Sequence, residues 1–161
     1  MRHTIFAAAL LVGCTTTPVA QVDADAQESA VSPACGADCP VIFHEVTSWG
    51  RQVFRSRLHP DGSYLAERLD FNSGAVTETV RRQVGVEGYQ AAYVALRPLE
   101  AAKDRSVYCS NAPTDGPSGV YTWDEENRFS IYYGCYGVDP SLSHLQRAEE
   151  QYEAIVAPAE G

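Results

Sequence analysis

The stretch from residue 41 to residue 84 constrains the fold most strongly, because it alternates short strand-like segments with turn sequences. Residues 52–59 show the pattern best: Gln52, Phe54, Ser56 and Leu58 fall on one face, and Arg55 and Arg57 fall on the other with Val53 and His59. Such alternation is typical of a strand with one buried and one solvated face. Because the intervening turns are short, the segment predicts an antiparallel meander. Its expected strands are 41–49, 52–59, 64–71 and 75–84.

The spacing of apolar residues changes after this meander. Four residues recur at the three- and four-residue spacing of an amphipathic helix: Val86, Tyr89, Tyr93 and Leu96. This helix should end before Pro98, since the residue preceding a proline disfavours helix. A second helix is expected at 140–157, capped by Asp139, with its glutamates, Glu149 included, mostly away from the apolar face. A short strand at 106–110 and a hairpin of 119–123 with 128–135 lie between the helices. The sequence therefore predicts an α+β fold, a mostly antiparallel sheet with two helices on one face.

The N-terminal residues form a signal pattern. Arg2 precedes an apolar run at 5–12, which is shorter than the ~20 residues of a membrane-spanning helix. The run closes with Leu11-Val12-Gly13-Cys14, which resembles the lipobox of bacterial lipoproteins. The resemblance implies cleavage before Cys14 and a diacylglyceryl anchor, of palmitate-type acyl chains, on its sulfur. Thr15 after the cysteine then favours the outer membrane, facing the periplasm. The alternative is an ordinary signal peptide cut elsewhere, which gives a soluble periplasmic or secreted protein.

Three parts follow from this interpretation: a lipoprotein signal peptide at 1–13, a lipid-anchored disordered tether at 14–34 and a single α+β domain at 35–158. The tether contains no aromatic residue, leucine or isoleucine after Cys14. Burial of such a segment cannot offset the entropy that ordering it would cost.

The chain has five cysteines. If Cys14 carries lipid, an even number remains, which suits two disulfides in an oxidising compartment. Cys109 and Cys135 stand at the ends of strands that fold back on each other, so we expect a bridge between them, and Cys35 and Cys39 could close a small loop. The pairings 35–109 with 39–135 and 35–135 with 39–109 stay open. The spacing is typical neither of a zinc site nor of a redox pair.

The domain opens with Cys35-Gly36-Ala37-Asp38-Cys39-Pro40. This opening, followed by strands and a late helix, resembles a family of uncharacterised bacterial exported domains that begin with Cys-x-Gly-x-Cys-Pro. Here the glycine stands one position early. The resemblance implies a strand-rich fold but no activity.

Charge and motifs narrow the classes of function. A net charge of −9 argues against a nucleic-acid partner. His44, His59 and His144 show no metal-ligand spacing, and no nucleophile elbow or phosphate-binding loop is present. We therefore expect no catalytic residue, no metal and no cofactor.

Two surfaces are candidates for binding. Several arginines lie on the early strands, Arg55 and Arg57 among them. One hypothesis is that they form cross-strand ion pairs with nearby acidic residues. The more specific hypothesis is that they form a binding patch for an anionic polymer of the envelope. Tyr121 and Trp123 share a strand face, which is either core or an aromatic binding platform.

These patterns predict an envelope-anchored lipoprotein that is a non-enzymatic binding or structural module. Its expected partners are the membrane, through lipid on Cys14, and an envelope protein or polymer. A hydrolase-like enzyme built from loop acids and histidines is the alternative, and a protein inhibitor acting through the loop at 111–118 is a third hypothesis. A deep pocket with a histidine beside a carboxylate would favour the enzyme, and an exposed aromatic or arginine patch would favour the binding module.

Overall fold

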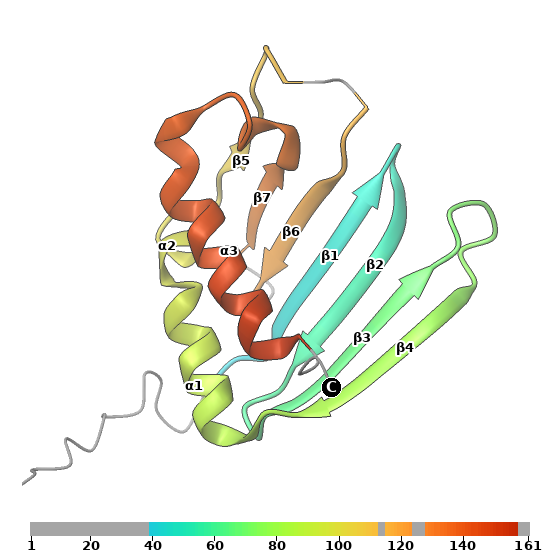
Figure 1. Ribbon diagram of the computed structural model, residues 1–161, viewed down its shortest axis with the longest axis vertical. Helices are drawn as coiled ribbons and strands as arrows, with labels where there is room; N and C mark the ends of the chain where they lie inside the picture. The colour runs from blue at the N-terminus through green and yellow to red at the C-terminus, as the bar shows by residue number, and fades with distance from the viewer. Residues whose placement is uncertain (1–38, 113–114, 124–127, 158–161) are drawn as a thin grey trace, which may run out of the picture. The chain divides into compact units, whose positions relative to one another are not determined.

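A single mixed sheet organises the part of the chain that the computed structural model describes, which is residues 39–112, 115–123 and 128–157 (Figure 1). Within these residues the strand order is β4-β3-β2-β1-β6-β7-β5, and every neighbouring pair is antiparallel except β5 with β7. The α+β prediction and the antiparallel meander are confirmed. The parallel pairing of β5 was not foreseen. The strands are β1 (Ile42–Ser48), β2 (Arg51–Leu58), β3 (Ser63–Leu69), β4 (Val76–Gln83), β5 (Ser106–Val107), β6 (Ser118–Thr122) and β7 (Arg128–Tyr132).

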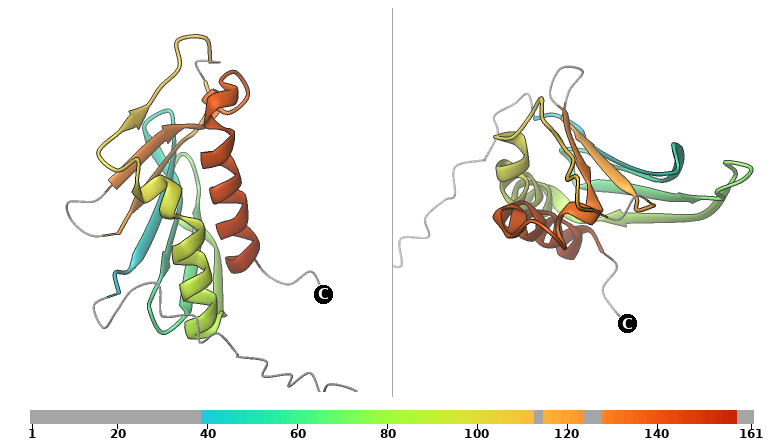
Figure 2. Two further views of the ribbon diagram at one scale, coloured as in Figure 1. Left: turned by 90° about the vertical axis from the view of Figure 1, so that its left-hand side faces the viewer. Right: turned by 90° about the horizontal axis from the view of Figure 1, so that it is seen from above.

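The helices lie together on one face of this sheet (Figures 1 and 2). They are α1 (Gly85–Ala95), α2 (Arg97–Glu100) and α3 (Ser143–Val156), and two 3-10 turns, η1 (Tyr133–Cys135) and η2 (Pro140–Leu142), precede α3. Strands β3 and β4 extend beyond the helix layer (Figure 2, right). The sheet is therefore covered on one side near β7 and left open near β4.

One row of side chains crosses the helix-covered face of the sheet from edge to edge. Successive register pairs join Val80 on β4, Ala66 on β3, Ser56 on β2, His44 on β1, Tyr121 on β6 and Phe129 on β7. The central members are nearly inaccessible, with Tyr121 and Phe129 at 0% exposure. Because side chains alternate along a strand, the residues between them point to the opposite, uncovered face. This row confirms the predicted face of Phe54, Ser56 and Leu58. Gln52 was predicted to share that face, which is wrong: it lies on the uncovered face beside Glu45, because the register between β1 and β2 shifts between Phe54 and Gln52.

The helix ends follow the local sequence. Asp139 accepts a hydrogen bond from the Ser141 backbone N–H at the start of η2, and α3 then runs to Val156, which confirms the predicted cap and C-terminal helix. The first helix stops at Ala95, but Pro98 opens the short α2 instead of a loop, because proline suits the first turn of a helix. Val86 was predicted on the apolar face and is instead 59% exposed.

The turn between β2 and β3 is fixed to the start of α1. Gly62 adopts φ +82°, and a Cβ there would collide with the backbone of Gly85. The Ser63 N–H donates to Asp61 Oδ1 in the same turn, and the Val84 N–H donates to the Gly62 carbonyl at 2.9 Å. Only glycine combines this backbone conformation with such a close approach, so the Asp-Gly turn also positions the first helix.

A disulfide joins Cys109 to Cys135, whose Cα atoms are 5.4 Å apart. This confirms the predicted bridge and excludes both alternative pairings that involve these two residues. Cys39 is also disulfide-bonded, so its partner is neither of them. The other predicted member, Cys35, lies outside the described residues, as does Cys14.

Candidate functional site

A groove opens between the covered face of β1–β4 and the last turns of α3. We call it the α3 groove, and its cavity volume is about 320 Å³. Its floor is mostly apolar, and charged side chains stand at its mouth. This size is at the lower end of the range for small-molecule sites. The lining residues are His44, Phe54, Tyr64, Ala66, Glu67, Arg68, Glu78, Val80, Glu153, Val156 and Ala157.

His44 forms part of the floor and is held on several sides. Its ring stacks on Tyr121 with centroids 4.1 Å apart and meets the edge of Phe54 at 5.5 Å. Its Nε2 is hydrogen-bonded to the Tyr133 hydroxyl at 2.8 Å. Burial lowers the pKa of His44 to about 4, because a charged imidazole would lose its hydration. The ring is therefore neutral at physiological pH and fixed in position.

Gly119 on β6 makes room for the tyrosine that binds His44. A Cβ at Gly119 would collide with the hydroxyl of Tyr133. Tyr133 follows β7 in η1, where its backbone N–H donates to the Pro117 carbonyl at 3.0 Å. Sequence reasoning missed this contact. The one available signal was a glycine inside a strand, which often marks a close approach.

Polar atoms gather behind His44 in a group that we call the buried tyrosine cluster, made of Tyr121, Tyr133, Tyr136, Tyr152 and Glu149. Among the described residues, the hydroxyls of Tyr121, Tyr136 and Tyr152 and one oxygen of Glu149 have no partner at good hydrogen-bond geometry, although the Tyr136 hydroxyl lies beside the Glu149 carboxyl. Burial is the main cause that raises the pKa of each of these tyrosines. Buried polar groups are costly to a fold unless they bond to one another, so the contact between Tyr136 and Glu149 offsets part of the cost of this cluster.

Glu149 was predicted to lie away from the apolar face of the last helix, and this is wrong. Its side chain is only 6% exposed. Burial raises the pKa of Glu149 to about 8, partly opposed by the neighbouring Tyr136 hydroxyl. A protonated carboxyl can be accommodated where a carboxylate cannot, so α3 tolerates this residue on its packed side.

The mouth of the α3 groove carries the charges. Arg68 Nε lies 3.1 Å from Glu78 Oε2, and both side chains are largely exposed. Glu153 faces them from α3, and partial burial, followed by the neighbouring Glu150, raises its pKa. With one arginine already paired, the mouth favours a positively charged group.

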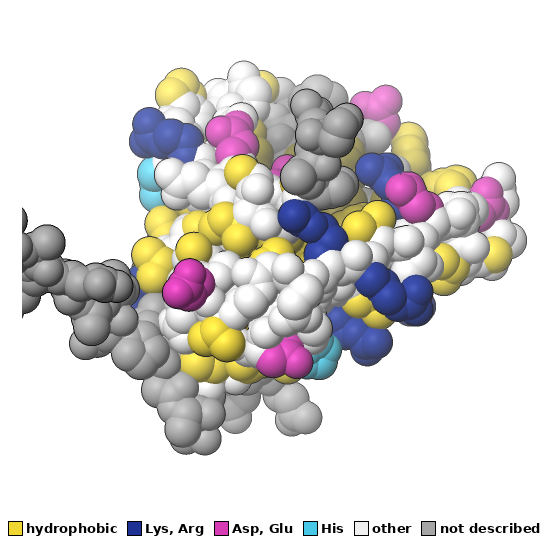
Figure 3. All heavy atoms as spheres, turned by 60° about the horizontal axis from the view of Figure 1, so that its bottom comes forward, with side chains coloured by type: hydrophobic (Ala, Val, Ile, Leu, Met, Phe, Trp, Pro, Cys, Tyr) yellow, Lys and Arg dark blue, Asp and Glu magenta, His cyan; other side chains and the backbone are white. Residues whose placement is uncertain are grey.

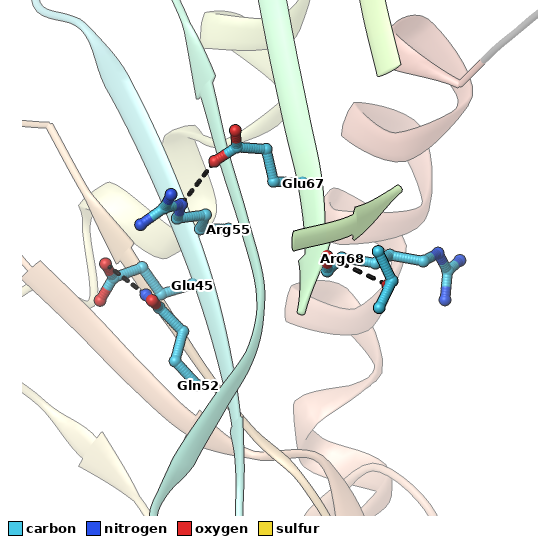
Figure 4. Close-up of polar contacts among 6 residues, drawn as sticks. Glu45, Gln52, Arg55, Glu67 and Arg68 are labelled. Atoms are coloured by element: carbon cyan, nitrogen blue, oxygen red, sulfur yellow. Dashed lines mark hydrogen bonds and ion pairs between the residues drawn. The ribbon is translucent and has the colours of Figure 1, made fainter. Parts of the chain in front are cut away.

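The uncovered face of the sheet carries the predicted arginine surface. Arg55 Nε lies 2.6 Å from Glu67 Oε2, and Gln52 Nε2 donates to Glu45 Oε1 at 2.8 Å (Figure 4). Arg57 is also exposed, and a hollow of about 380 Å³ lies between these side chains and Phe43. Arginine side chains gather on the side of the molecule where β2–β4 lie (Figure 3). The hypothesis of cross-strand ion pairs is confirmed for Arg55, and the charge of Arg55 is therefore already partly compensated.

The aromatic half of the predicted binding surface is wrong. Tyr121 is 0% and Trp123 3% exposed, because their shared face of β6 is the one that packs on the helices. The other predicted residues are scattered. His144 is exposed and its Nδ1 lies 2.9 Å from the Ser141 carbonyl, while His59 lies in the turn after β2.

Comparisons with protein families, with curated proteins and with solved structures found no match. Among the residues that the structure describes, no three His, Cys, Asp or Glu side chains come together as a metal site would require. None of the described helices is long and apolar enough to cross a membrane.

Proposed function

We propose that this chain is a non-enzymatic binding module of the bacterial envelope, and that the α3 groove is its binding site. The single observation that carries the proposal is the groove itself, with a volume of about 320 Å³ between the sheet and α3. A groove with an apolar floor and a few polar groups is the usual form of a ligand site.

The lining suggests the class of ligand. Phe54, Ala66 and Val80 offer an apolar floor, whereas Glu78 and Glu153 stand at the mouth. An apolar or aromatic body would displace water from the floor, and a cationic group at its end would face the carboxylates. We therefore propose an amphipathic cation, such as an aromatic amine or the side chain of a basic peptide.

Two small probes of equal shape and opposite charge test this proposal. Phenethylamine and 3-phenylpropionate are titrated separately into the ¹⁵N-labelled protein, with amide shifts followed by NMR. The amine should shift residues of β3, β4 and α3 with a Kd of about 1 mM, as suits so small a probe, and the acid should bind more weakly.

Two variants and one control locate the probe. Glu153→Gln should weaken binding of the amine severalfold and leave the acid unaffected, because it removes a charge at the mouth. Ala66→Phe should block both probes by filling the floor. Glu87→Gln is the matched control, since Glu87 is exposed on α1 and is not part of the groove lining. If the probes shift the same amides equally in the native protein and in Ala66→Phe, the proposed site is refuted.

The cellular part of the proposal concerns attachment. We propose that the chain is anchored to the outer membrane through lipid on Cys14 and faces the periplasm. The Cys109–Cys135 disulfide supports an oxidising compartment. Cys14→Ser should abolish labelling with a palmitate analogue and release the protein from membranes. Retention of Cys14→Ser on membranes would refute the anchor, and a soluble, unlabelled native chain would favour the secreted alternative.

A hydrolase-like enzyme is a second candidate, favoured by one observation. His44 lines the same groove as Glu153. However, the lowered pKa of His44, about 4, makes it a weak base, and Tyr133 occupies its Nε2. Para-nitrophenyl ester turnover with a pH midpoint near 4, lost in His44→Phe, would support the enzyme; we expect no such turnover.

A further inference from the structure

The edge strand β4 is the longest uncovered border of the sheet. In the described residues it pairs only with β3, and it extends beyond the helix layer (Figure 2). All of its residues are exposed except Val80 and Arg82, which are half-buried. An open edge with unpaired main-chain groups is a template for another strand.

The register with β3 shows which main-chain groups of β4 point outward. Val84 donates to Gly62, and the same register pairs Arg82 with Tyr64 and Val80 with Ala66. Hydrogen-bonded and non-hydrogen-bonded pairs alternate in an antiparallel ladder. The even-numbered residues from Glu78 to Val84 therefore bond to β3, and the main-chain groups of Thr79, Arg81 and Gln83 face the open edge.

We infer that this edge pairs antiparallel with β4 of a second copy of the chain, around a two-fold axis at Val80. This inference is argued from the register of β4 and not from the proposed function, but Glu78 and Val80 also line the α3 groove, so a cationic ligand there would compete with the dimer for Glu78. In that register Thr79 of each copy bonds to Arg81 of the other, which gives about four main-chain hydrogen bonds. Val80 then faces its own counterpart at a non-hydrogen-bonded position.

Charge selects this partner and this register. On the groove side, Glu78 of each copy faces Arg82 of the other, so two ion pairs flank the axis symmetrically. In the single chain, Arg82 is half-buried and forms no ion pair with another described residue. The exposed contact of Glu78 with Arg68 is of the weak surface kind, so Glu78 is available.

Neighbouring registers are less favourable. A slip by one residue would place the groove-side row of one copy against the outward row of the other, which a continuous sheet does not allow. A slip of two residues towards Gln83 places Arg81 opposite Arg81, and a slip the other way leaves both Glu78 and Arg82 opposite a valine. The irregularity opposite Arg68 and Leu69 limits the ladder to the part of β4 after Thr77. The contact is small, so we expect a weak dimer.

Cysteine crosslinking tests the axis directly. Val80→Cys in the purified protein should form a disulfide-linked dimer under mild oxidation, since the two side chains face each other at a distance that suits a disulfide. Thr79→Cys is the matched control, because Thr79 is at least as exposed but faces Arg81 and not itself. Equal crosslinking of both variants would indicate random collision and overturn the inference.

Charge exchange tests the register. Sedimentation of the native protein from about 10 µM to 1 mM should show a monomer–dimer equilibrium. Glu78→Arg and Arg82→Glu should each weaken it about ten- to thirtyfold, because two like-charge pairs replace two attractive ones. Mixing the two variants should restore a dimer, since every facing pair is then opposite in charge, and the double variant E78R/R82E should restore it within one chain. A native protein that is monomeric throughout, or a mixture that stays monomeric, would overturn the inference.

Discussion

The two ends of the sheet treat the same row of side chains differently. Near β7 the row is sealed by the helices, and Tyr121 and Phe129 are at 0% exposure. Near β4 it continues into the α3 groove, where Val80 is only half-buried. Both regions contain ionisable groups: at the sealed end burial raises the pKa of Glu149 to about 8, whereas at the open end Arg68 and Glu78 form an exposed ion pair. Burial therefore decides whether a titratable side chain serves packing or recognition.

The largest expected contrast lies within that row. Phe129→Ala should lower the free energy of unfolding by about 3 to 5 kcal/mol, as expected for a sealed aromatic side chain. Val80→Ala should cost about 1 kcal/mol, because its site can stay hydrated. Urea denaturation of both variants measures the difference. Equal losses would mean that the open end is as tightly packed as the sealed end.

Removal of the disulfide tests how much this bridge contributes to the stability of the sealed end of the sheet. Cys109 and Cys135 are 26 residues apart in the sequence, so replacement of both by serine should cost about 3 kcal/mol through the entropy of the unfolded chain. Thermal unfolding with and without the bridge gives the value. Peptide mapping without reductant should recover the linked pair in the native protein, and free thiols there would contradict the structure.

The next prediction concerns how the free energy of unfolding depends on pH through the buried Glu149. The folded-state pKa of Glu149 is about 8, above its ordinary 4.5, so the folded state binds the proton more tightly. Its stabilising contribution is complete below about pH 4.5 and is lost as pH rises towards 8. Glu149→Gln should therefore remove a loss of about 4 kcal/mol between pH 5 and pH 9.

His44 acts with the opposite sign. Its folded-state pKa of about 4 lies below the ordinary 6.5, so stability falls as pH drops from 6.5 towards 4, where the unfolded state takes up the proton more readily. Denaturation curves of native protein and Glu149→Gln over this range distinguish the two groups, because the variant should keep the acid-side loss. A native stability that is flat from pH 4 to pH 9 would argue against burial of both.

The smallest effect belongs to the uncovered face. Arg55 and Glu67 form an ion pair with side chains 47% and 20% exposed, and such pairs contribute about 0.2 to 1 kcal/mol. A double-mutant cycle with Arg55→Ala and Glu67→Ala should give a coupling energy in that range that shrinks with added salt. A salt-independent coupling would mean that the pair is desolvated.

Local pattern determined much of this protein. Alternation assigned the faces of residues 54–58, the turn sequences gave the meander, and Asp139 marked the start of the last helix, because each signal depends only on neighbours along the chain. The face of Gln52 was missed, since the register shift between β1 and β2 is not visible in the alternation. Cys109 and Cys135 could be paired for a similar reason, since the hairpin between them brings its own ends together.

Tertiary packing alone decided the candidate site. His44, Tyr133 and Glu149 come from β1, η1 and α3, and the distances between them depend on how a helix settles on strands about one hundred residues away. The sequence therefore left Tyr121 and Trp123 open between core and a binding surface and put Glu149 in solvent, since nothing in their local pattern reveals which side another element will cover. The groove exists because α3 ends before it reaches β4. How far a helix extends over a distant strand depends on their packing, so the local sequence of neither element predicts it.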